Sequence, residues 1–208
     1  MIPELGARGH EAVAVDLPGD DRSKGLPEYA DLIEGAISND REAVVVAQSL
    51  GGFASVMACA RTPVHRLVLV NAMIPLPHET PGEWFSATGA EAARRHAAEA
   101  CGYSAEFDVD TYFLHDVPAS VRAAGESRAR DEADIVFAQP CDFERWPGVP
   151  TRVLATEDDR FFPPDFQRRV ARERLHVEVD VMRGGHLVAL ARPSELAERL
   201  VRYGSDLP

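Results

Sequence analysis

The sequence predicts an α/β protein in which a mostly parallel sheet is flanked by helices and interrupted by a helical insertion. Short apolar runs typical of buried strands alternate with helical segments before residue 72 and again from residue 151 onward. Between Ala72 and Pro147 helical stretches occur but no strong buried strand does. With 208 residues, 45% of them hydrophobic, the chain suits one domain with a substantial core. We expect a single domain, residues 1–208, with a helical cap at residues 72–147.

The elements before the insertion are predicted from local patterns. Met1 to Gly9 resembles the end of a helix, and a Leu17-Pro18-Gly19 turn closes a short strand, Glu11 to Asp16. Tyr29 to Ile37 has apolar residues along one helical face. A continuous apolar run then predicts a buried strand, followed by an apolar helix and a second buried strand: Glu42 to Ala47, Phe53 to Ala60 and Arg66 to Asn71.

The elements from the insertion onward follow the same reasoning. Helical stretches are expected near Gly89 to Ala100 and over Ala119 to Phe137. Prolines near helix starts and apolar runs then predict, in order, a strand, a helix, a strand and a helix: Thr151 to Ala155, Pro164 to Arg174, Leu175 to Met182 and Pro193 to Tyr203. We expect the insertion to fold over the open end of the sheet.

Charge and cysteine content exclude several classes of protein. The 22 Lys+Arg and 34 Asp+Glu residues give a formal net charge of −12, so we expect neither nucleic acid nor a membrane surface as a partner. Three cysteines without CxxC spacing argue against a disulfide framework and a zinc cluster, and a reducing cytoplasm is the simplest setting. No signal peptide or membrane-spanning run is visible. The sequence does not fix an oligomeric state.

The strongest candidate for chemistry is Ser49, which lies between a predicted strand and a predicted helix. A sharp strand-to-helix turn that presents a serine hydroxyl needs small residues two positions before and two after, and Ala47 and Gly51 occupy these positions. The N–H of Leu50, at the start of the helix, is well placed to donate to an oxyanion. An ordinary serine in a Gly-rich turn is the structural alternative.

Asp159 and His186 complete a possible catalytic triad with Ser49. Each of the three residues follows the carboxyl end of a predicted strand, where open α/β sheets place their sites. A serine hydroxyl needs a base to accept its proton, and a carboxylate orients the imidazole and stabilises the imidazolium. The pair His115–Asp116 could orient a substrate, but a solvated pair is favoured. The group Arg168, Arg169, Arg172 and Arg174 is predicted to be a solvated helix face.

At this point the sequence resembles the α/β-hydrolase superfamily. The matching stretches are DLPGDDRS (16–23), AQSLGG (47–52), LVLVN (67–71), TEDDRFFPPDFQ (156–167) and GGHLVAL (184–190). The part from Thr151 onward is similar to the small esterase and hydroxynitrile-lyase branch, in which the acid eight residues before the Gln of an FQ pair belongs to the triad. The resemblance implies that Asp159, rather than Asp158, takes that role. It also implies a small ester as substrate and no cofactor or metal.

The chain departs from this family in two respects. In the family, a strand that precedes the first one seen here ends in an HG-type loop, which supplies the second oxyanion N–H. We therefore expect Met1 to be an internal methionine and the natural product to begin about 20–30 residues earlier, from the usual lengths of a strand, a loop and a helix. The lyases of this branch also use a lysine in the cap, whereas Lys24 is the only lysine of this chain. Ester hydrolysis is therefore favoured over lyase chemistry.

Four residues are predicted to line a substrate pocket: Gln48, Trp84, Phe113 and Trp146. Such pockets are mostly apolar with a few polar groups, although the aromatic side chains could equally hold the cap onto the sheet. Two other functions remain open on the sequence. One is a hydroxynitrile-lyase-like or other acyl or carbon–carbon bond reaction on the same triad. The other is a non-catalytic protein that binds a hydrophobic ligand.

Overall fold

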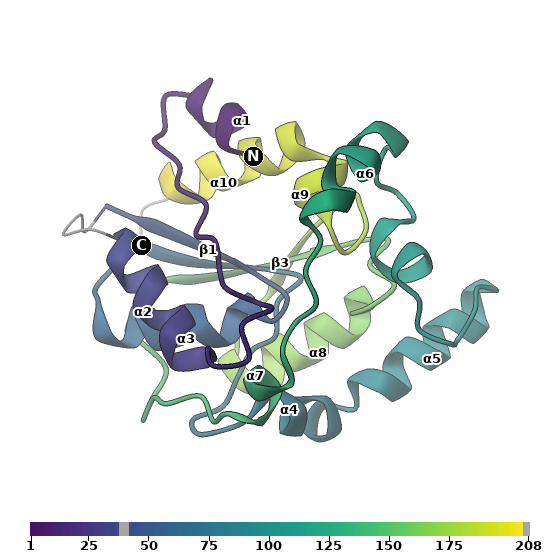
Figure 1. Ribbon diagram of the computed structural model, residues 1–208, viewed down its shortest axis with the longest axis horizontal. Coiled ribbons are helices and arrows are strands. Elements are labelled where there is room, and N and C mark those ends of the chain that lie inside the picture. Colours follow the sequence, from purple (N-terminus) through teal and green to yellow (C-terminus); the bar gives the residue numbers. More distant parts are fainter. Residues whose placement is uncertain (38–41, 206–208) are drawn as a thin grey trace.

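The computed structural model describes residues 1–37 and 42–205, and its centre is a four-stranded parallel sheet (Figure 1). The strands lie side by side in chain order: β1 (Val44–Gln48), β2 (Arg66–Val70), β3 (Thr151–Thr156) and β4 (Val179–Met182). Val46 is paired with Val68, and Leu69 with Val153. Because all four strands run in the same direction, their carboxyl ends meet at one edge of the sheet.

Helices connect and cover these strands. Before β3 they are α1 (Ile2–Gly6), α2 (Leu26–Ile37), α3 (Gly51–Arg61), α4 (Pro81–Thr88), α5 (Ala90–Cys101), α6 (Ala119–Gly125) and α7 (Asp134–Ala138). After β3 they are α8 (Pro164–Leu175), α9 (Val188–Ala191) and α10 (Pro193–Ser205). A π-helical turn, η1 (Asp110–Leu114), and a 3₁₀ turn, η2 (Glu126–Arg128), lie within the insertion.

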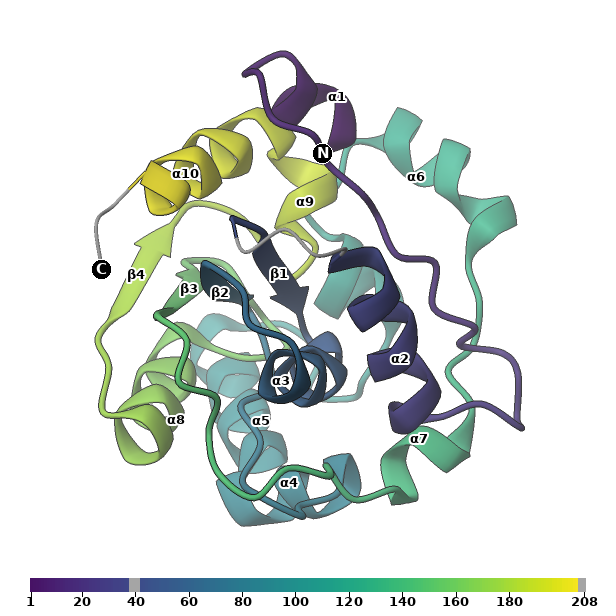
Figure 2. The same ribbon diagram turned by 90° about the vertical axis from the view of Figure 1, so that its left-hand side faces the viewer.

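Helices cover both faces of the sheet, and the alternation of side chains along β2 shows how. Leu67 and Leu69 pack with α2, α3 and α8 on one face, whereas Val68 and Val70 pack with α10 on the other. All four side chains are buried, as expected for a strand covered on both sides. Figure 2 shows α10 on one side of the strands and α3 and α8 on the other.

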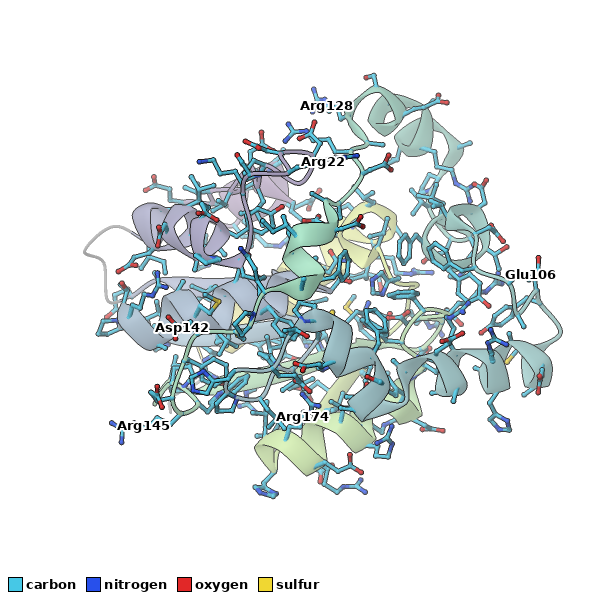
Figure 3. All side chains as sticks on the ribbon, turned by 60° about the horizontal axis from the view of Figure 1, so that its bottom comes forward. Arg22, Glu106, Arg128, Asp142, Arg145 and Arg174 are labelled. Carbon is cyan, nitrogen blue, oxygen red and sulfur yellow. The ribbon has the colours of Figure 1, made fainter. Side chains whose placement is uncertain are left out.

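The insertion between β2 and β3 is attached to the sheet domain by buried polar contacts. Its first helix, α4, begins with a capping box in which Thr80 and Glu83 exchange side chain to backbone hydrogen bonds. Trp84 of α4 is buried and donates from Nε1 to the carbonyl of Ile74, just after β2. Arg174 of α8, which is labelled in Figure 3, donates to the carbonyl of Ile74 and pairs with the carboxylate of Glu79.

The predicted α/β class is confirmed, including the strands after residue 42 and the helices α2, α3, α5, α8 and α10. The predicted strand Glu11–Asp16 is wrong, because this segment pairs with no strand and Val13 is exposed. The predicted helix over residues 119–137 is divided into α6, η2 and α7. Arg174 is not on a solvated face, since its side chain is only 8% exposed beside Glu79.

The described helices contain none that is both long and apolar enough to cross a membrane.

Gly52 lets helix α3 approach the loop after β2. A Cβ atom at this position would lie 2.0 Å from the carbonyl oxygen of Met73. In the same place, the N–H of Met73 donates to the carbonyl of Ser49 at 3.0 Å. Because Gly52 has no side chain, the backbone of the Ser49 turn can lie against the loop after β2.

We predict that Gly52→Ala lowers the free energy of unfolding by about 1–3 kcal/mol, because rigid backbone must shift to admit the methyl group. Gly51→Ala is the matched control, since no atom lies within 4 Å of its added Cβ. That variant should be neutral or stabilising by up to about 1 kcal/mol, the usual gain for alanine over glycine in a helix. Urea denaturation measures both changes, and equal effects of the two substitutions would contradict the prediction.

Candidate active site

Ser49 lies in a strained turn between β1 and α3. Its φ of 51° is in the left-handed region, which non-glycine residues rarely adopt. The carbonyl of Ser49 accepts hydrogen bonds from the N–H groups of Gly52 and Met73. Leu50 is the N-cap residue of α3, so its N–H is among those that have no partner within the helix. The turn therefore places the serine side chain and free N–H groups at the carboxyl edge of the sheet.

Asp159 and His186 form a buried hydrogen-bonded pair. Nδ1 of His186 lies 2.9 Å from Oδ2 of Asp159, and the two residues are 1% and 3% exposed. The other oxygen of Asp159 accepts hydrogen bonds from the backbone N–H groups of Phe161 and Phe162, each at 2.9 Å. Gln167 donates to Oδ2 at 3.2 Å. These bonds compensate the burial of the carboxylate and fix its orientation.

The pairing with a carboxylate determines which nitrogen of His186 can act as a base. A carboxylate accepts hydrogen bonds, so Nδ1 carries the proton and Nε2 of the neutral ring has a free lone pair. Nε2 is buried and has no hydrogen-bond partner in the described part of the chain. In this structure the hydroxyl of Ser49 is therefore not bonded to His186.

Side chains at the ends of β1 and β2 hold the backbone of His186 at the same edge. Nε2 of Gln48 donates to the carbonyl of His186 at 2.6 Å. Nδ2 of Asn71 donates to the same carbonyl at 3.1 Å. Because Gln48 immediately precedes Ser49, the serine turn and the histidine loop are linked by a direct hydrogen bond.

Asn71 is a residue that sequence reasoning missed. It is fully buried, has a φ of 46°, and its Oδ1 accepts hydrogen bonds from the N–H of Thr156 and from Nε2 of Gln167. Thr156 in turn donates to the carbonyl of Gly185. A polar residue directly after the apolar run Leu67–Val70 was the signal that could have identified Asn71.

Three aromatic rings surround the imidazole of His186. Phe113, from the π-helical turn η1, is stacked on it with a centroid distance of 4.9 Å and an angle of 21°. Phe161 and Phe162 make edge contacts at 5.2 and 5.4 Å. The predicted site residue Phe113 therefore contacts the histidine, and the rings exclude water from one side of the base.

The insertion also contacts the histidine loop through His115 and Asp116. Oδ2 of Asp116 accepts a 2.7 Å hydrogen bond from the N–H of Gly185, next to His186. A Cβ atom on Gly185 would lie 2.6 Å from Asp116 and from His115. Both ring nitrogens of His115 are buried without partners, and burial lowers the pKa of this imidazole. The prediction that His115–Asp116 is a solvated pair is therefore wrong.

The other predicted pocket residues lie apart from the histidine. Trp84 packs edge-on against Phe162 and Phe166 in the core. Trp146 packs against Phe143 and donates weakly to Thr151, near the start of β3. Neither tryptophan lines the pocket that α4, α5 and several phenylalanine rings enclose.

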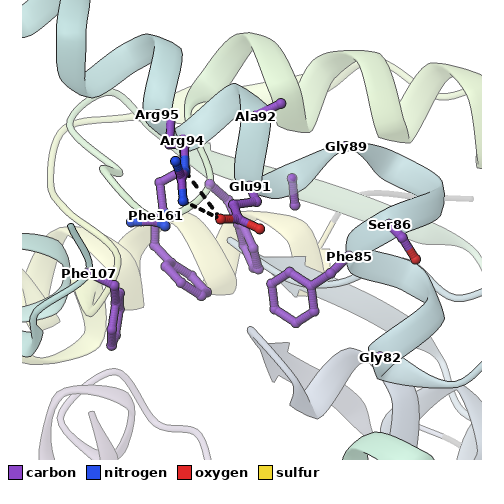
Figure 4. Close-up of a pocket in the computed structure, with 12 residues that line it drawn as sticks. Gly82, Phe85, Ser86, Gly89, Glu91, Ala92, Arg94, Arg95, Phe107 and Phe161 are labelled. Carbon is purple, nitrogen blue, oxygen red and sulfur yellow. Dashed lines mark hydrogen bonds and ion pairs between the residues drawn. The ribbon is translucent and has the colours of Figure 1, made fainter. Parts of the chain in front are cut away.

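That pocket has a volume of about 620 Å³ and lies between the insertion and the loop after β3 (Figure 4). Its walls are the end of α4, the start of α5 and a set of phenylalanine rings. Phe161 and Phe162 line it, and the same two rings contact His186. The pocket therefore borders two of the rings that contact the imidazole of His186.

We predict that Asp116→Ala increases hydrogen exchange of the Gly185 amide by about 10- to 100-fold. The physical reason is the loss of a hydrogen bond to a charged group, which contributes about 1.5–3 kcal/mol. Asp110→Ala is the control, because that carboxylate is exposed and pairs with Arg122 at the surface. NMR-detected exchange measures the effect, and unchanged Gly185 protection in Asp116→Ala would contradict it.

Comparisons with known proteins agree with this architecture. Solved structures with similar folds include polyneuridine aldehyde esterase, with 16% identity, a TM-score of 0.73 and coverage of 98% of this chain and 92% of that one. An extracellular α/β-hydrolase from a Paenibacillus species has 17% identity, a TM-score of 0.74 and coverage of 98% and 91%. The methylesterase MES16 from Arabidopsis has 17% identity, a TM-score of 0.73 and coverage of 98% and 90%.

No curated protein sequence matches the chain significantly. The model of the alpha/beta hydrolase family, in contrast, matches residues 1–199 of the 208. The match covers the serine turn, the Asp159–His186 pair and the insertion between β2 and β3. The chain therefore belongs to the alpha/beta hydrolase family.

Proposed function

We propose that the protein is a serine hydrolase, a carboxylesterase that cleaves a small ester with Ser49 as nucleophile. The observation that supports this most directly is the buried Asp159–His186 pair, whose free Nε2 lies at the same sheet edge as the strained Ser49 turn. Nε2 needs a donor, and the proposal assigns that position to the Ser49 hydroxyl. Catalytic hydrogen bonds commonly form only when substrate is bound.

The mechanism follows from these roles. His186 Nε2 accepts the proton as Ser49 Oγ attacks the ester carbonyl, and the C=O electrons move to the oxygen. The N–H of Leu50, at the positive end of α3, donates to this oxyanion. His186 returns its proton to the leaving alcohol, leaving an acyl-serine. Water, deprotonated by His186, then releases the acid and restores Ser49.

Asp159 keeps His186 in the required tautomer throughout this cycle. Its carboxylate accepts from Nδ1 and stabilises the imidazolium that forms after each proton transfer. Two backbone N–H groups and Gln167 prevent it from rotating away. The aromatic rings around His186 lower the local dielectric, which strengthens these electrostatic interactions.

We also assign the cap of the enzyme and its cellular compartment. Residues 72–147 form the cap, because Phe113 and Asp116 of this segment contact the histidine and its loop. The small ester would bind between cap and sheet. We place the reaction in the cytoplasm, and the free state of Cys59, Cys101 and Cys141 supports a reducing compartment.

The second candidate function is a non-catalytic ligand-binding protein. One observation favours it: aromatic rings pack around the imidazole of His186, and this imidazole is not hydrogen-bonded to Ser49. A fluorophosphonate probe separates the two functions, because it reacts only with an activated serine. Labelling of Ser49, located by peptide mass spectrometry, supports the hydrolase, whereas an unlabelled folded protein supports the binder.

We predict that Ser49→Ala lowers kcat/KM for p-nitrophenyl acetate by at least about 1,000-fold, because the nucleophile is lost. Ser23→Ala is the control, since that serine lies in an exposed turn beside Asp21 and should keep full activity. A spectrophotometric assay with both purified variants measures the difference. Full activity in Ser49→Ala would refute the assignment of the nucleophile.

We predict a loss of similar size, about 10,000-fold in kcat, for Asp159→Asn, because an amide can stabilise the wrong imidazole tautomer. Asp158→Asn is the matched neighbour: its side chain is exposed and only its backbone N–H bonds to Gly184. That control should retain activity within about twofold. If Asp158→Asn were the inactive variant and Asp159→Asn the active one, the acid would have been assigned to the wrong residue.

A further inference from the structure

The pocket in the insertion combines an aromatic lining with one buried cation. Phe85, Phe107 and Phe161 line it with their rings, and the side chain of Arg94 from α5 is also part of the wall (Figure 4). Phe85 and Phe161 contact each other at 6.3 Å, and Phe107 and Phe161 at 5.6 Å. Together these rings form an apolar surface long enough for a ring-containing ligand.

Arg94 has no anionic partner among the described residues. It is only 9% exposed, and its one hydrogen bond there runs from Nη1 to the carbonyl of Ala105 at 3.2 Å. The guanidinium also lies over the rings of Tyr112 and Phe107, at 4.8 and 5.9 Å. Since a guanidinium has five N–H donors, this one hydrogen bond leaves most of them without an acceptor among the described residues.

The neighbouring Arg95 shows the opposite arrangement. It also lines the pocket, but its side chain is 61% exposed and pairs with Glu91 at 2.8 Å (Figure 4). The charge of Arg95 is already neutralised by this pair, and an exposed ion pair of this kind contributes little to stability. The two adjacent arginines therefore differ in the one property that matters for recognising an anion, namely an uncompensated charge.

Burying a charge without a counter-charge is unfavourable, and aromatic faces compensate for it only in part. A ligand carboxylate would supply the missing partner, because it matches the fork of a guanidinium with two parallel hydrogen bonds. The chain as a whole has a net charge of −12, which repels anions. Selection of a carboxylate here must therefore come from a local cation, and Arg94 is placed to provide it.

We propose that this pocket binds a substrate that combines an aromatic ring with a carboxylate, and that Arg94 binds the carboxylate. The inference rests on the proposed function, and it narrows the small ester to an aromatic ester that has a second, free carboxyl group. Phe161 and Phe162 connect the pocket to the catalytic base, since they line the pocket and contact the imidazole of His186. Arg94 is thus a specificity-determining residue that takes no part in the chemical steps.

The test compares two ligands of nearly identical shape, 2-naphthoate and the neutral 2-naphthamide, by isothermal titration calorimetry at pH 7. We expect the protein to bind the carboxylate at least tenfold more tightly than the amide. Arg94→Met should abolish this preference and leave the affinity for the amide within about twofold. Arg95→Met is the matched control and should keep the preference.

Two results would overturn the proposal. One is equal affinity of the unsubstituted protein for the two ligands, which needs no variant to fold. The other is a parallel loss of both affinities in Arg94→Met, which would assign Arg94 a purely structural role through Tyr112 and Phe107. Arg94→Lys serves as the second variant, and it should retain part of the preference because it keeps the positive charge.

The outcome is independent of whether the protein is an esterase. Ser49→Ala should show the same preference for 2-naphthoate, because binding does not need the nucleophile. Persistence of the preference in a protein that hydrolyses no ester would refute the proposed function alone. Conversely, hydrolysis of p-nitrophenyl benzoate at least as fast as of mono-p-nitrophenyl terephthalate, without the ligand preference, would refute the inference alone.

Discussion

The side chain of Asn71 is the interaction on which the geometry of the site depends. It follows β2, is fully buried, and bonds to Thr156 at the end of β3, to Gln167 of α8 and to the backbone of His186. These partners lie at the end of β3, on the helix that connects β3 to β4, and in the loop after β4. An apolar residue of the same size would leave several of these groups unsatisfied, each at about 1–3 kcal/mol. The parallel sheet brings the loops together, and Asn71 fixes them to one another.

Polar contacts bind the insertion to this framework. Arg174 and Glu79 join it to α8, Trp84 joins it to the loop after β2, and Asp116 joins it to Gly185. Only the last of these touches the loop of His186. The position of the cap and the position of the histidine loop are therefore coupled through one hydrogen bond and through the ring of Phe113.

Much of the sheet, the polar pair and helix α5 could be predicted from the sequence, whereas most contacts of the insertion could not. The apolar runs that form β1, β2 and β3 indicate buried strands by composition alone. Ser49, Asp159 and His186 follow the ends of β1, β3 and β4. Glu11–Asp16 has the same composition but no partner strand, which a local pattern does not reveal. In the insertion, the roles of Asp116 and Arg94 depend on neighbours far apart in sequence, Gly185 and Tyr112 among them.

Phe161 and Phe162 perform three tasks at once: their N–H groups hold Asp159, their rings touch His186, and the same rings form a wall of the pocket. Substituting either ring would disturb the surroundings of the base and the pocket wall together, although the backbone N–H groups would still hold Asp159. Phe85 and Phe107 also line the pocket, but the described ring contacts of His186 do not include them. Substitutions that adapt the pocket to a new ligand shape are therefore expected at these two positions. Divergence within this architecture should accumulate on α4 and α5 while the Phe161–Phe162 dipeptide stays invariant.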